Sequence, residues 1–382
     1  MTNWTLHHGD CREVLRGLTA ESLDAVVTDP PYSLGFMGKA WDRSGIANDP
    51  AMWAAVLHVL KPGAYVLAFG GTRTYHRMAC AVEDAGFVVK DSLMWLYGSG
   101  FPKSLNLGDG IGTALKPGYE PIVLAQKPLQ GTYVANLARW GVGGLNIDGC
   151  RIESQEQWQG NNEPSASMNG YGPGDGDGWQ GNWTKRSESH AAGRWPANVI
   201  LDEAAGALLD AQSGTRKSGA IHGTYKGFST TGIYGEGGTA RRDRDSSEGG
   251  ASRFFYCAKA SRSERDAGLD ALPLVSAAAI TDSGEGSARL DSPRTGAGRT
   301  SGGRNTHPTV KPLSLMRWLV RLVTPDGGIV LDPFAGSGTT LCAAILEGRS
   351  TVGIEMTEEY LPLIRGRATH AERQAILPLG VA

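Results

Sequence analysis

The segment from Gly328 to Glu355 constrains the fold most, because it has the pattern of a strand, a glycine-rich turn, a helix and a second strand. The turn is Phe334-Ala335-Gly336-Ser337-Gly338, and an apolar, helix-forming run follows it. In such a βαβ unit the glycines let the backbone approach a ligand, and an acid ending the second strand binds ribose hydroxyls. Glu355 stands 17 residues after Gly338, close to the usual offset of about 20. The segment therefore predicts an α/β fold with a nucleotide-type pocket.

Three ligands compete for this turn. A phosphate-binding P-loop needs Lys after its last glycine, where this chain has Thr339. A dinucleotide site needs a third glycine at the position of Leu341. The spacing of Phe334, Gly336 and Gly338 matches the F-x-G-x-G loop that binds S-adenosylmethionine. A glycine-rich turn without a ligand is the remaining alternative.

A second motif, Asp29-Pro30-Pro31-Tyr32, follows the apolar run Leu23–Thr28, which predicts a buried parallel strand. Parallel sheets bind ligands at the carboxyl ends of their strands. The prolines fix φ and remove two N–H donors, so their carbonyls only accept hydrogen bonds. Asp29 and the Pro30 carbonyl can both accept from one NH₂ group, while Tyr32 offers a stacking face. The motif suits a flat heterocycle with an exocyclic amine; the alternative is a proline-rich turn of no function.

Together the two motifs resemble those of the amino-group DNA methyltransferases, and their order along the chain resembles the beta class. The segment Asn305–Pro312 is similar to the one that precedes the cofactor loop in that class. The resemblance covers roughly residues 4–130 and 305–370. It implies a circularly permuted Rossmann-like α/β fold of seven mostly parallel strands, with helices on both faces and a large loop-rich insertion. Asp29 and Asp332 would end neighbouring strands.

The resemblance also implies a reaction: methyl transfer from S-adenosylmethionine to an exocyclic amine in double-stranded DNA. An aspartate opening the catalytic motif is more usual for adenine than for cytosine in this family, so we expect adenine and leave cytosine open. A non-catalytic DNA-binding module and an RNA or protein-amine methyltransferase are the alternatives from other classes. A homodimer and a separate restriction nuclease, as in restriction–modification, stay open as partners.

Site residues follow from the motifs. The catalytic set is Asp29, Pro30, Pro31 and Tyr32, and we expect no cysteine nucleophile and no metal. Asp10 either caps the helix that starts at Cys11 or accepts from the cofactor's adenine amine. Lys311 either lines the cofactor pocket or is an ordinary surface residue. The full cofactor set is Asp10, Cys11, Thr309, Lys311, Asp332, Phe334, Ala335, Gly336, Gly338, Thr339, Thr340 and Glu355.

The net charge of −2 shows no global preference for nucleic acid, so a positive surface must be local. Between Arg216 and Arg262, nine basic side chains outnumber four acidic ones, among them Arg241, Arg242 and Arg244. We expect this segment to contact DNA; the alternative is a solvated loop. Phe101 and Lys103 follow a predicted strand and would complete the site near the base. The loop Ser33–Asp49, with Phe36, Lys39 and Trp41, would close over the base.

Three regions are predicted: a catalytic half at 1–140, an insertion for target recognition at 141–304, and a cofactor half at 305–382. Alternating strands and helices in the first region predict a parallel sheet. The insertion is rich in Gly, Ser, Asp and Asn, which favours loops. Five scattered cysteines without C-x-x-C argue against a zinc site or a disulfide framework. No signal or long apolar run occurs, so we expect a soluble, cytoplasmic protein without a membrane partner.

Overall fold

The structure is a computed structural model. It describes residues 3–34, 40–98, 100, 104–154, 158–161, 187–188, 193–217, 221–226, 239–244, 247–258, 263–276 and 302–376; for 40, 158–161, 187–188, 221–226 and 239–244 it describes the backbone only. The chain divides into two compact units. The first comprises Met1–Cys150, Asn198–Ala205 and Cys257–Ala382, and the second comprises Arg151–Ala197 and Gly206–Tyr256.

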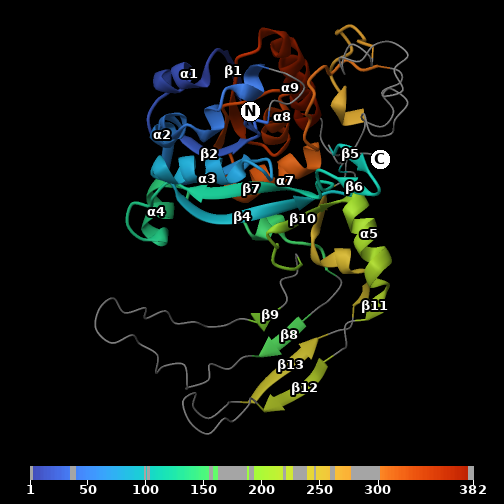
Figure 1. Ribbon diagram of the computed structural model, residues 1–382. Coiled ribbons are helices and arrows are strands. Elements are labelled where there is room, and N and C mark those ends of the chain that lie inside the picture. Colours follow the sequence, from blue (N-terminus) through green and yellow to red (C-terminus); the bar gives the residue numbers. More distant parts are fainter. Residues whose placement is uncertain are drawn as a thin grey trace. The chain divides into compact units, whose positions relative to one another are not determined.

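A nine-stranded sheet organises the first unit (Figure 1). Its order is β1-β17-β16-β2-β3-β7-β4-β10-β15. In that order the strands are Trp4–His8, Ser350–Glu355, Ile329–Asp332, Leu23–Thr28, Leu60–Phe69, Tyr119–Gln126, Val88–Leu96, Val199–Asp202 and Tyr256–Ala258. The five strands from β1 to β3 run parallel, and only β7 pairs antiparallel with both its neighbours, β3 and β4. The predicted mixed, mostly parallel sheet is confirmed, as is the adjacency of β16 and β2.

The sheet has two more strands than the seven expected. The additional β10 pairs in parallel with β4, and β15 follows it at the edge. Both come from the stretch 141–304, where the sequence pattern favoured loops. Only Ile200 and Leu201 of the four residues of β10 are buried, and four residues are too few to give a periodicity. Sequence patterns alone therefore underrate such strands.

Eight helices of the described chain surround the sheet or follow its strands: α1 (Cys11–Gly17), α2 (Pro50–Val59), α3 (Tyr75–Asp84), α4 (Tyr133–Trp140), α5 (Glu203–Ser213), α7 (Leu313–Val323), α8 (Thr339–Leu346) and α9 (Leu361–Ile376). α1, α2 and α3 pack in one row, and α7, α8 and α9 pack in another. Every residue of β2 is buried, so both faces of the central strand are covered. The largest core cluster joins Trp53 and Val56 of α2 to Val66 of β3.

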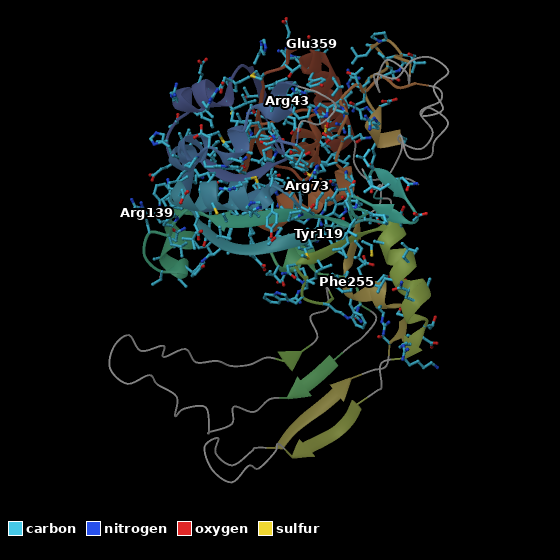
Figure 2. All side chains as sticks on the ribbon, viewed as in Figure 1. Arg43, Arg73, Tyr119, Arg139, Phe255 and Glu359 are labelled. Atoms are coloured by element: carbon cyan, nitrogen blue, oxygen red, sulfur yellow. The ribbon has the colours of Figure 1, made fainter. Side chains whose placement is uncertain are left out.

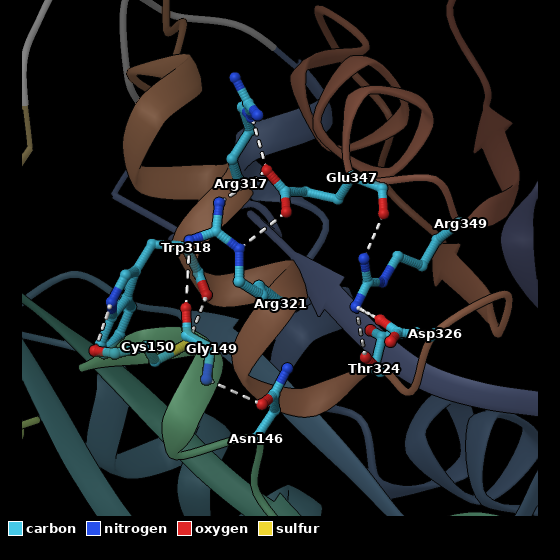
Figure 3. Close-up of polar contacts among 10 residues, drawn as sticks. All are labelled: Asn146, Gly149, Cys150, Arg317, Trp318, Arg321, Thr324, Asp326, Glu347 and Arg349. Atoms are coloured by element: carbon cyan, nitrogen blue, oxygen red, sulfur yellow. Dashed lines mark hydrogen bonds and ion pairs between the residues drawn. The ribbon is translucent and has the colours of Figure 1, made fainter. Parts of the chain in front are cut away.

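A network of charged residues holds α7 to the end of α8 (Figure 3). Glu347 accepts from Arg317 Nε at 2.7 Å and from both Arg321 Nε and Nη2 at 2.7 and 2.8 Å. Arg321 also donates to the Gly149 carbonyl, and Trp318 Nε1 donates to the Cys150 carbonyl at 3.3 Å. These bonds fasten the chain to α7 where the first segment of the first unit ends.

The second unit contains a four-stranded antiparallel sheet of order β12-β13-β8-β9. Its strands are Ile221–Lys226, Thr239–Arg244, Trp158–Asn161 and Ser187–Glu188. A two-stranded ladder joins β11 (Arg216–Lys217) to β14 (Glu248–Gly249). At the start of this unit, Ile152 forms an isolated antiparallel β-bridge with Arg194.

A small hairpin of β5 (Asn106–Gly108) and β6 (Ile111–Gly112) stands between β4 and β7 in the chain of the first unit. Short 3-10 turns occur at Ala40–Arg43, Ile46–Asn48, Asp148–Cys150, Ala251–Phe254, Ser263–Arg265 and Glu358–Tyr360. Within the described part of the chain, none of the helices combines the length and the apolar character needed to cross a membrane.

Candidate active site

A cavity of about 960 Å³ opens at the carboxyl ends of the parallel strands in the first unit. Its walls come from the residues that follow β1, β2, β3, β16 and β17, and from the segment before α7. Figure 2 labels two of the lining residues, Arg73 after β3 and Tyr119 at the start of β7. The cavity therefore lies where parallel sheets bind ligands, at the edge to which the strands deliver their last residues.

Sequence reasoning placed its residues well. All four residues of the Asp29–Tyr32 motif line the cavity, and so does every residue of the expected cofactor set except Gly338. Two motifs 300 residues apart in the chain meet here because β2 and β16 are neighbours in the sheet.

The two glycines of the loop are required for different physical reasons. Gly338 has φ +74° and precedes α8, and a Cβ there would stand 2.9 Å from Ile364 Cγ2 of α9. Gly336 has φ +51°, and a Cβ there would stand 2.9 Å from the ring of His307. Gly338 thus serves helix packing, whereas Gly336 brings the loop against a ring that itself lines the cavity.

Lys311 connects the catalytic motif to the rest of the site. Its Nζ donates to Asp29 Oδ2 at 2.6 Å and to the Tyr32 hydroxyl at 3.2 Å, and it lies 3.3 Å from Glu120 Oε2. The Tyr32 hydroxyl donates to Glu120 Oε2 at 3.1 Å. The ammonium also sits 4.8 Å from the centre of the Phe69 ring. The surface alternative for Lys311 is wrong, because 9% of its side chain is exposed.

The electrostatics of this group are strongly coupled. Burial alone would lower the pKa of Lys311, but the charges of Asp29 and Glu120 outweigh it and the pKa is raised. Burial, with the same two carboxylates, raises the pKa of Tyr32 well above its ordinary value. Lys311 is therefore an ammonium and Tyr32 a neutral phenol, and both act as donors to the carboxylates.

One oxygen of this group is left without a partner. Asp29 Oδ1 is buried and has no hydrogen bond to any residue that the structure describes, while Oδ2 is taken by Lys311. A buried, unpaired carboxylate oxygen is costly unless a ligand completes it. Asp29, which lines the cavity, therefore keeps one strong acceptor without a partner.

Four further acids line the same cavity, namely Asp10, Asp42, Asp332 and Glu355. Glu355 accepts from the amides of Gly336 at 2.7 Å and Thr357 at 2.8 Å, which fixes its carboxylate beside the glycine loop. Burial raises the pKa of Asp332 to about 6, although Thr28 Oγ1 donates to it at 2.7 Å. Asp10 caps α1 by accepting from the Arg12 amide, so its capping role is confirmed.

Aromatic rings that the motifs did not single out enclose the pocket. His307 lies 4.7 Å from the ring of Tyr360 and 6.4 Å from Trp41, and all three line the cavity. Burial lowers the pKa of His307 to about 4, so its ring is neutral. Trp41 belongs to the loop predicted to close over the site, and buried Asp42 holds that loop by accepting from the Ser33 and Leu34 amides.

Glu120, His307 and Tyr360 are the lining residues whose part sequence reasoning missed. Glu120 opens a strand rather than ending one, and its carboxylate reaches the site only because β7 runs antiparallel to β3. His307 lies within the segment Asn305–Pro312, and membership of that segment was the signal available in the sequence. Its contact with Gly336 is visible only in the structure.

Some predicted residues lie outside the described part of the chain. Phe101 and Lys103 do, as do Phe36 and Lys39. Arg241, Arg242 and Arg244 lie on β13, whose backbone alone is described. Among the described residues, no group of three His, Cys, Asp or Glu side chains is placed to hold a metal ion. Burial raises the pKa of Cys11 to about 12, so this thiol in the cavity wall is protonated.

Comparison with known proteins identifies the family. The model of the DNA methylase family, N6_N4_Mtase, matches residues 23–366. The chain therefore belongs to this family, whose members use S-adenosylmethionine as the methyl donor.

Individual relatives match over shorter stretches. Type II methyltransferase M.ScaI of Streptomyces caespitosus is 42% identical over 81 residues, which are 21% of this chain and 26% of that protein. DNA adenine methyltransferase YhdJ of Escherichia coli K12 is 47% identical over 57 residues, 15% of this chain and 19% of that protein. The chain thus aligns with about a quarter or less of the length of these relatives.

Among solved structures, the PvuII DNA methyltransferase, described as cytosine-N4-specific, covers all of this chain and 89% of its own, at 14% identity and a TM-score of 0.48. TTHA0409 of Thermus thermophilus, complexed with S-adenosyl-L-methionine, covers 97% and 96% at 19% identity and a TM-score of 0.42. The fold assignment above rests on the strand order of this chain itself.

Proposed function

We propose that this protein transfers a methyl group from S-adenosylmethionine to the exocyclic amine of adenine at a specific site in double-stranded DNA. The observation that carries the proposal is the unpaired Asp29 Oδ1, a buried acceptor held at the cavity by a lysine that occupies the other oxygen. The aspartate that opens the motif favours adenine over cytosine by family tendency, and the cytosine amine is the alternative.

The reaction requires the chain to activate a nucleophile on the substrate, and it requires no covalent bond between the chain and the base. The cofactor supplies a methyl group on a positively charged sulfur. An exocyclic amine is a poor nucleophile because its lone pair is delocalised into the ring. Asp29 Oδ1 and the Pro30 carbonyl would accept its two N–H groups and so direct the lone pair toward the methyl. As the nitrogen gains the methyl it loses one proton, and Asp29 Oδ1 is the acceptor already bonded to that N–H.

Lys311 and Glu120 would keep this acceptor ready. Lys311 holds Oδ2, so the carboxylate keeps one orientation and presents Oδ1. Glu120 binds both the lysine and the Tyr32 hydroxyl, which fixes the ring expected to stack on the base. In duplex DNA the target base must leave the helix before it can reach this cavity.

The residues present suit the cofactor. Glu355 stands beside the glycine loop with each oxygen already bonded to one amide, which leaves further acceptor sites for ribose hydroxyls. Asp10 lines the cavity after β1 and would accept from the cofactor's adenine amine, in addition to its bond with Arg12. The remaining cofactor set of the cavity wall, from Asp332 to Thr340 and with Thr309, would surround the methionine part.

One experiment tests reaction, base and site together. Genomic DNA from a methylation-free host expressing the chain would be sequenced by a method that reports modified bases. We expect N6-methyladenine at one short motif, and none in cells expressing Asp29→Ala. If the sequencing finds N4-methylcytosine instead, cytosine replaces adenine as the proposed target base. If the wild-type protein leaves the DNA unmodified, the proposal is contradicted.

We further propose that the stretch 141–304 carries target recognition, with contacts from Arg241, Arg242 and Arg244 to DNA phosphates. Each phosphate contact contributes about 0.9 to the slope of log affinity against log salt. Replacing the three arginines by Gln should therefore weaken DNA binding and flatten the slope by about 2 to 3. Cofactor affinity by calorimetry is the control and should not change. An unchanged DNA affinity and slope would place recognition elsewhere.

A further inference from the structure

The hairpin of β5 and β6 carries apolar side chains and has almost no cover. Leu105 is 70% exposed, Leu107 64%, Ile111 59% and Leu115 92%. All residues from 105 to 116 are exposed, so neither face of the hairpin packs on the described body of the first unit. A two-stranded hairpin without a core is marginally stable in water by itself. Leu107 and Ile111 lie on its two strands, while Leu105 precedes β5 and Leu115 follows β6. Four exposed, large apolar side chains on and beside such an element indicate a surface that a partner covers.

Hydrogen bonds hold the two ends of this hairpin where it leaves and rejoins the first unit. The Ser104 hydroxyl accepts from the amides of Thr113 at 2.8 Å and Ala114 at 3.2 Å, and Thr113 Oγ1 accepts from the Leu105 amide at 2.9 Å. Lys116 Nζ donates to the Gly98 carbonyl at 2.7 Å. At the tip, Asp109 and Gly110 both have positive φ, as tight two-residue hairpin turns require. The element is anchored at its base and presents its apolar side chains outward.

The hairpin is continuous with the catalytic cavity. Its returning strand leads into β7, and every residue from Thr113 to Glu120 lines the cavity. Leu115, the most exposed of the four apolar residues, therefore stands in the cavity wall itself. Five residues further on, Glu120 contacts Lys311 and Tyr32. The hairpin thus adjoins the wall of the cavity through the residues that follow β6.

A base that leaves the duplex opens a gap lined by the flat, apolar faces of its neighbours. Proteins that distort DNA insert Leu, Ile, Phe or Met side chains between such faces. The partner that best fits an apolar hairpin beside a cavity for an extruded base is therefore the duplex from which the base came. A second copy of the chain would also cover apolar surface, but it would block the cavity that Leu115 borders.

We propose that the β5–β6 hairpin is a wedge that enters the base stack of duplex DNA, with Leu115 holding the gap left by the extruded target base. The inference rests on the proposed function. The inference adds Leu115 as a residue that acts on the paired duplex and takes no part in methyl transfer itself. Leu107 and Ile111 would extend the apolar contact between the hairpin and the DNA.

The test compares two substrates that differ only in how easily the target base leaves the helix. Both are duplexes carrying the motif found by methylome sequencing; in one of them the target base faces a mismatched partner. Leu115→Ala should lower kcat/KM on the paired duplex about tenfold, and on the mismatched duplex by less than about twofold, because extrusion costs least from a mismatch. Leu115→Phe should restore the rate on the paired duplex, since another apolar wedge fills the gap.

Leu274→Ala is the matched control, because Leu274 is 62% exposed and is not among the described residues of the cavity wall. It should leave both rates unchanged. An equal loss on both substrates for Leu115→Ala, or no loss on either, would overturn the wedge. So would a change in sedimentation that shows the variant to have lost self-association. If the wild-type protein methylates neither duplex, the proposed function fails and not the wedge alone.

Discussion

Two largely buried carboxylates of the first unit, Glu347 and Asp29, both pair with basic side chains but differ in how many of their oxygens are hydrogen-bonded. At the junction of α7 and α8, both oxygens of Glu347 are held by arginines, with three hydrogen bonds of 2.7 to 2.8 Å (Figure 3). In the cavity, Asp29 has one oxygen on Lys311 at 2.6 Å and the other without a partner among the described residues. Both carboxylates are largely buried, with side chains 7% and 22% exposed.

The difference separates a structural ion pair from a site prepared for a ligand. Both oxygens of Glu347 are held by arginines, and Glu347 is not among the described residues of the cavity wall, so the Glu347 group contributes to stability. The Asp29 group keeps an acceptor free at the cost of an unsatisfied buried oxygen. Sites that must bind a transition state accept such costs because the ligand supplies the missing partner.

Asp29→Ala gives the largest expected effect. Removing the acceptor should reduce the methylation rate at least about a hundredfold, as the loss of a preorganised hydrogen-bonding group does. The affinity for S-adenosylmethionine, measured by calorimetry, should stay within about threefold, since the carboxylate is assigned to the target amine. A variant that keeps more than a few percent of the rate would remove Asp29 from catalysis.

Lys311→Met should rank second. The variant leaves Asp29 and Glu120 facing each other without the cation, so kcat should fall about tenfold or more. Adding Glu120→Gln should recover part of the rate, because it removes the second uncompensated carboxylate. A double-mutant cycle measures this coupling. Additive effects of the two substitutions would show that Lys311 and Glu120 act independently, contrary to the geometry.

A third prediction concerns Asp332, an acid whose pKa burial raises from 3.8 to about 6. Between these values the folded protein keeps a proton that the unfolded chain has lost, so this residue makes stability fall as the pH rises from about 4 to 6. Asp332→Asn removes that loss. Relative to wild type, its free energy of unfolding should improve by about 2 kcal/mol between pH 4 and pH 7.

Urea unfolding of both proteins at the two pH values measures this difference. His307, with a pKa lowered to about 4, acts in the opposite direction, since its neutral folded form gains stability as the pH rises from 4 toward 6.5. His307 is present in both proteins, so its contribution cancels in the difference between wild type and Asp332→Asn. A stability difference that does not change with pH would mean that Asp332 is ionised throughout.

Glu347→Gln should have the smallest effect and complete the comparison. Arg317 and Arg321 are 41% and 33% exposed, so water can replace part of what they lose. The free energy of unfolding should fall by about 1 kcal/mol, while kcat of the folded enzyme stays unchanged. A clear loss of kcat at full folding would mean that the structural group also serves the site.

The sequence predicted much of the sheet and the position of the site. The strand Leu23–Thr28 has the expected bounds, and Asp29 and Asp332 stand at the ends of neighbouring strands, as the resemblance implied. Long apolar runs and glycine turns carry their information locally, so a single sequence is enough to find them. Asp10 and Glu355 line the cavity because Asp10 follows β1 and Glu355 ends β17.

What the sequence could not predict depends on pairings between distant residues. Glu120 becomes part of the site through the antiparallel direction of β7, which no local pattern encodes. The ammonium of Lys311 reaches Asp29 across 282 positions of the chain. The short strand β10 is recognisable only beside its partner β4, about 100 residues earlier in the sequence. In each case the decisive contact is tertiary.

The bonds that fasten Cys150 and Gly149 to α7 mark the first of four places where the chain passes between the two units. Between the second and third crossing lies Asn198–Ala205, which contains the sheet strand β10. An exchange of the second unit between related proteins must therefore splice two separate inserts, 151–197 and 206–256, around eight retained residues. A single cassette covering both would remove a strand from the sheet that bears the cavity. On the proposal that this stretch recognises the target, altered target specificity should be inherited as a pair of linked segments.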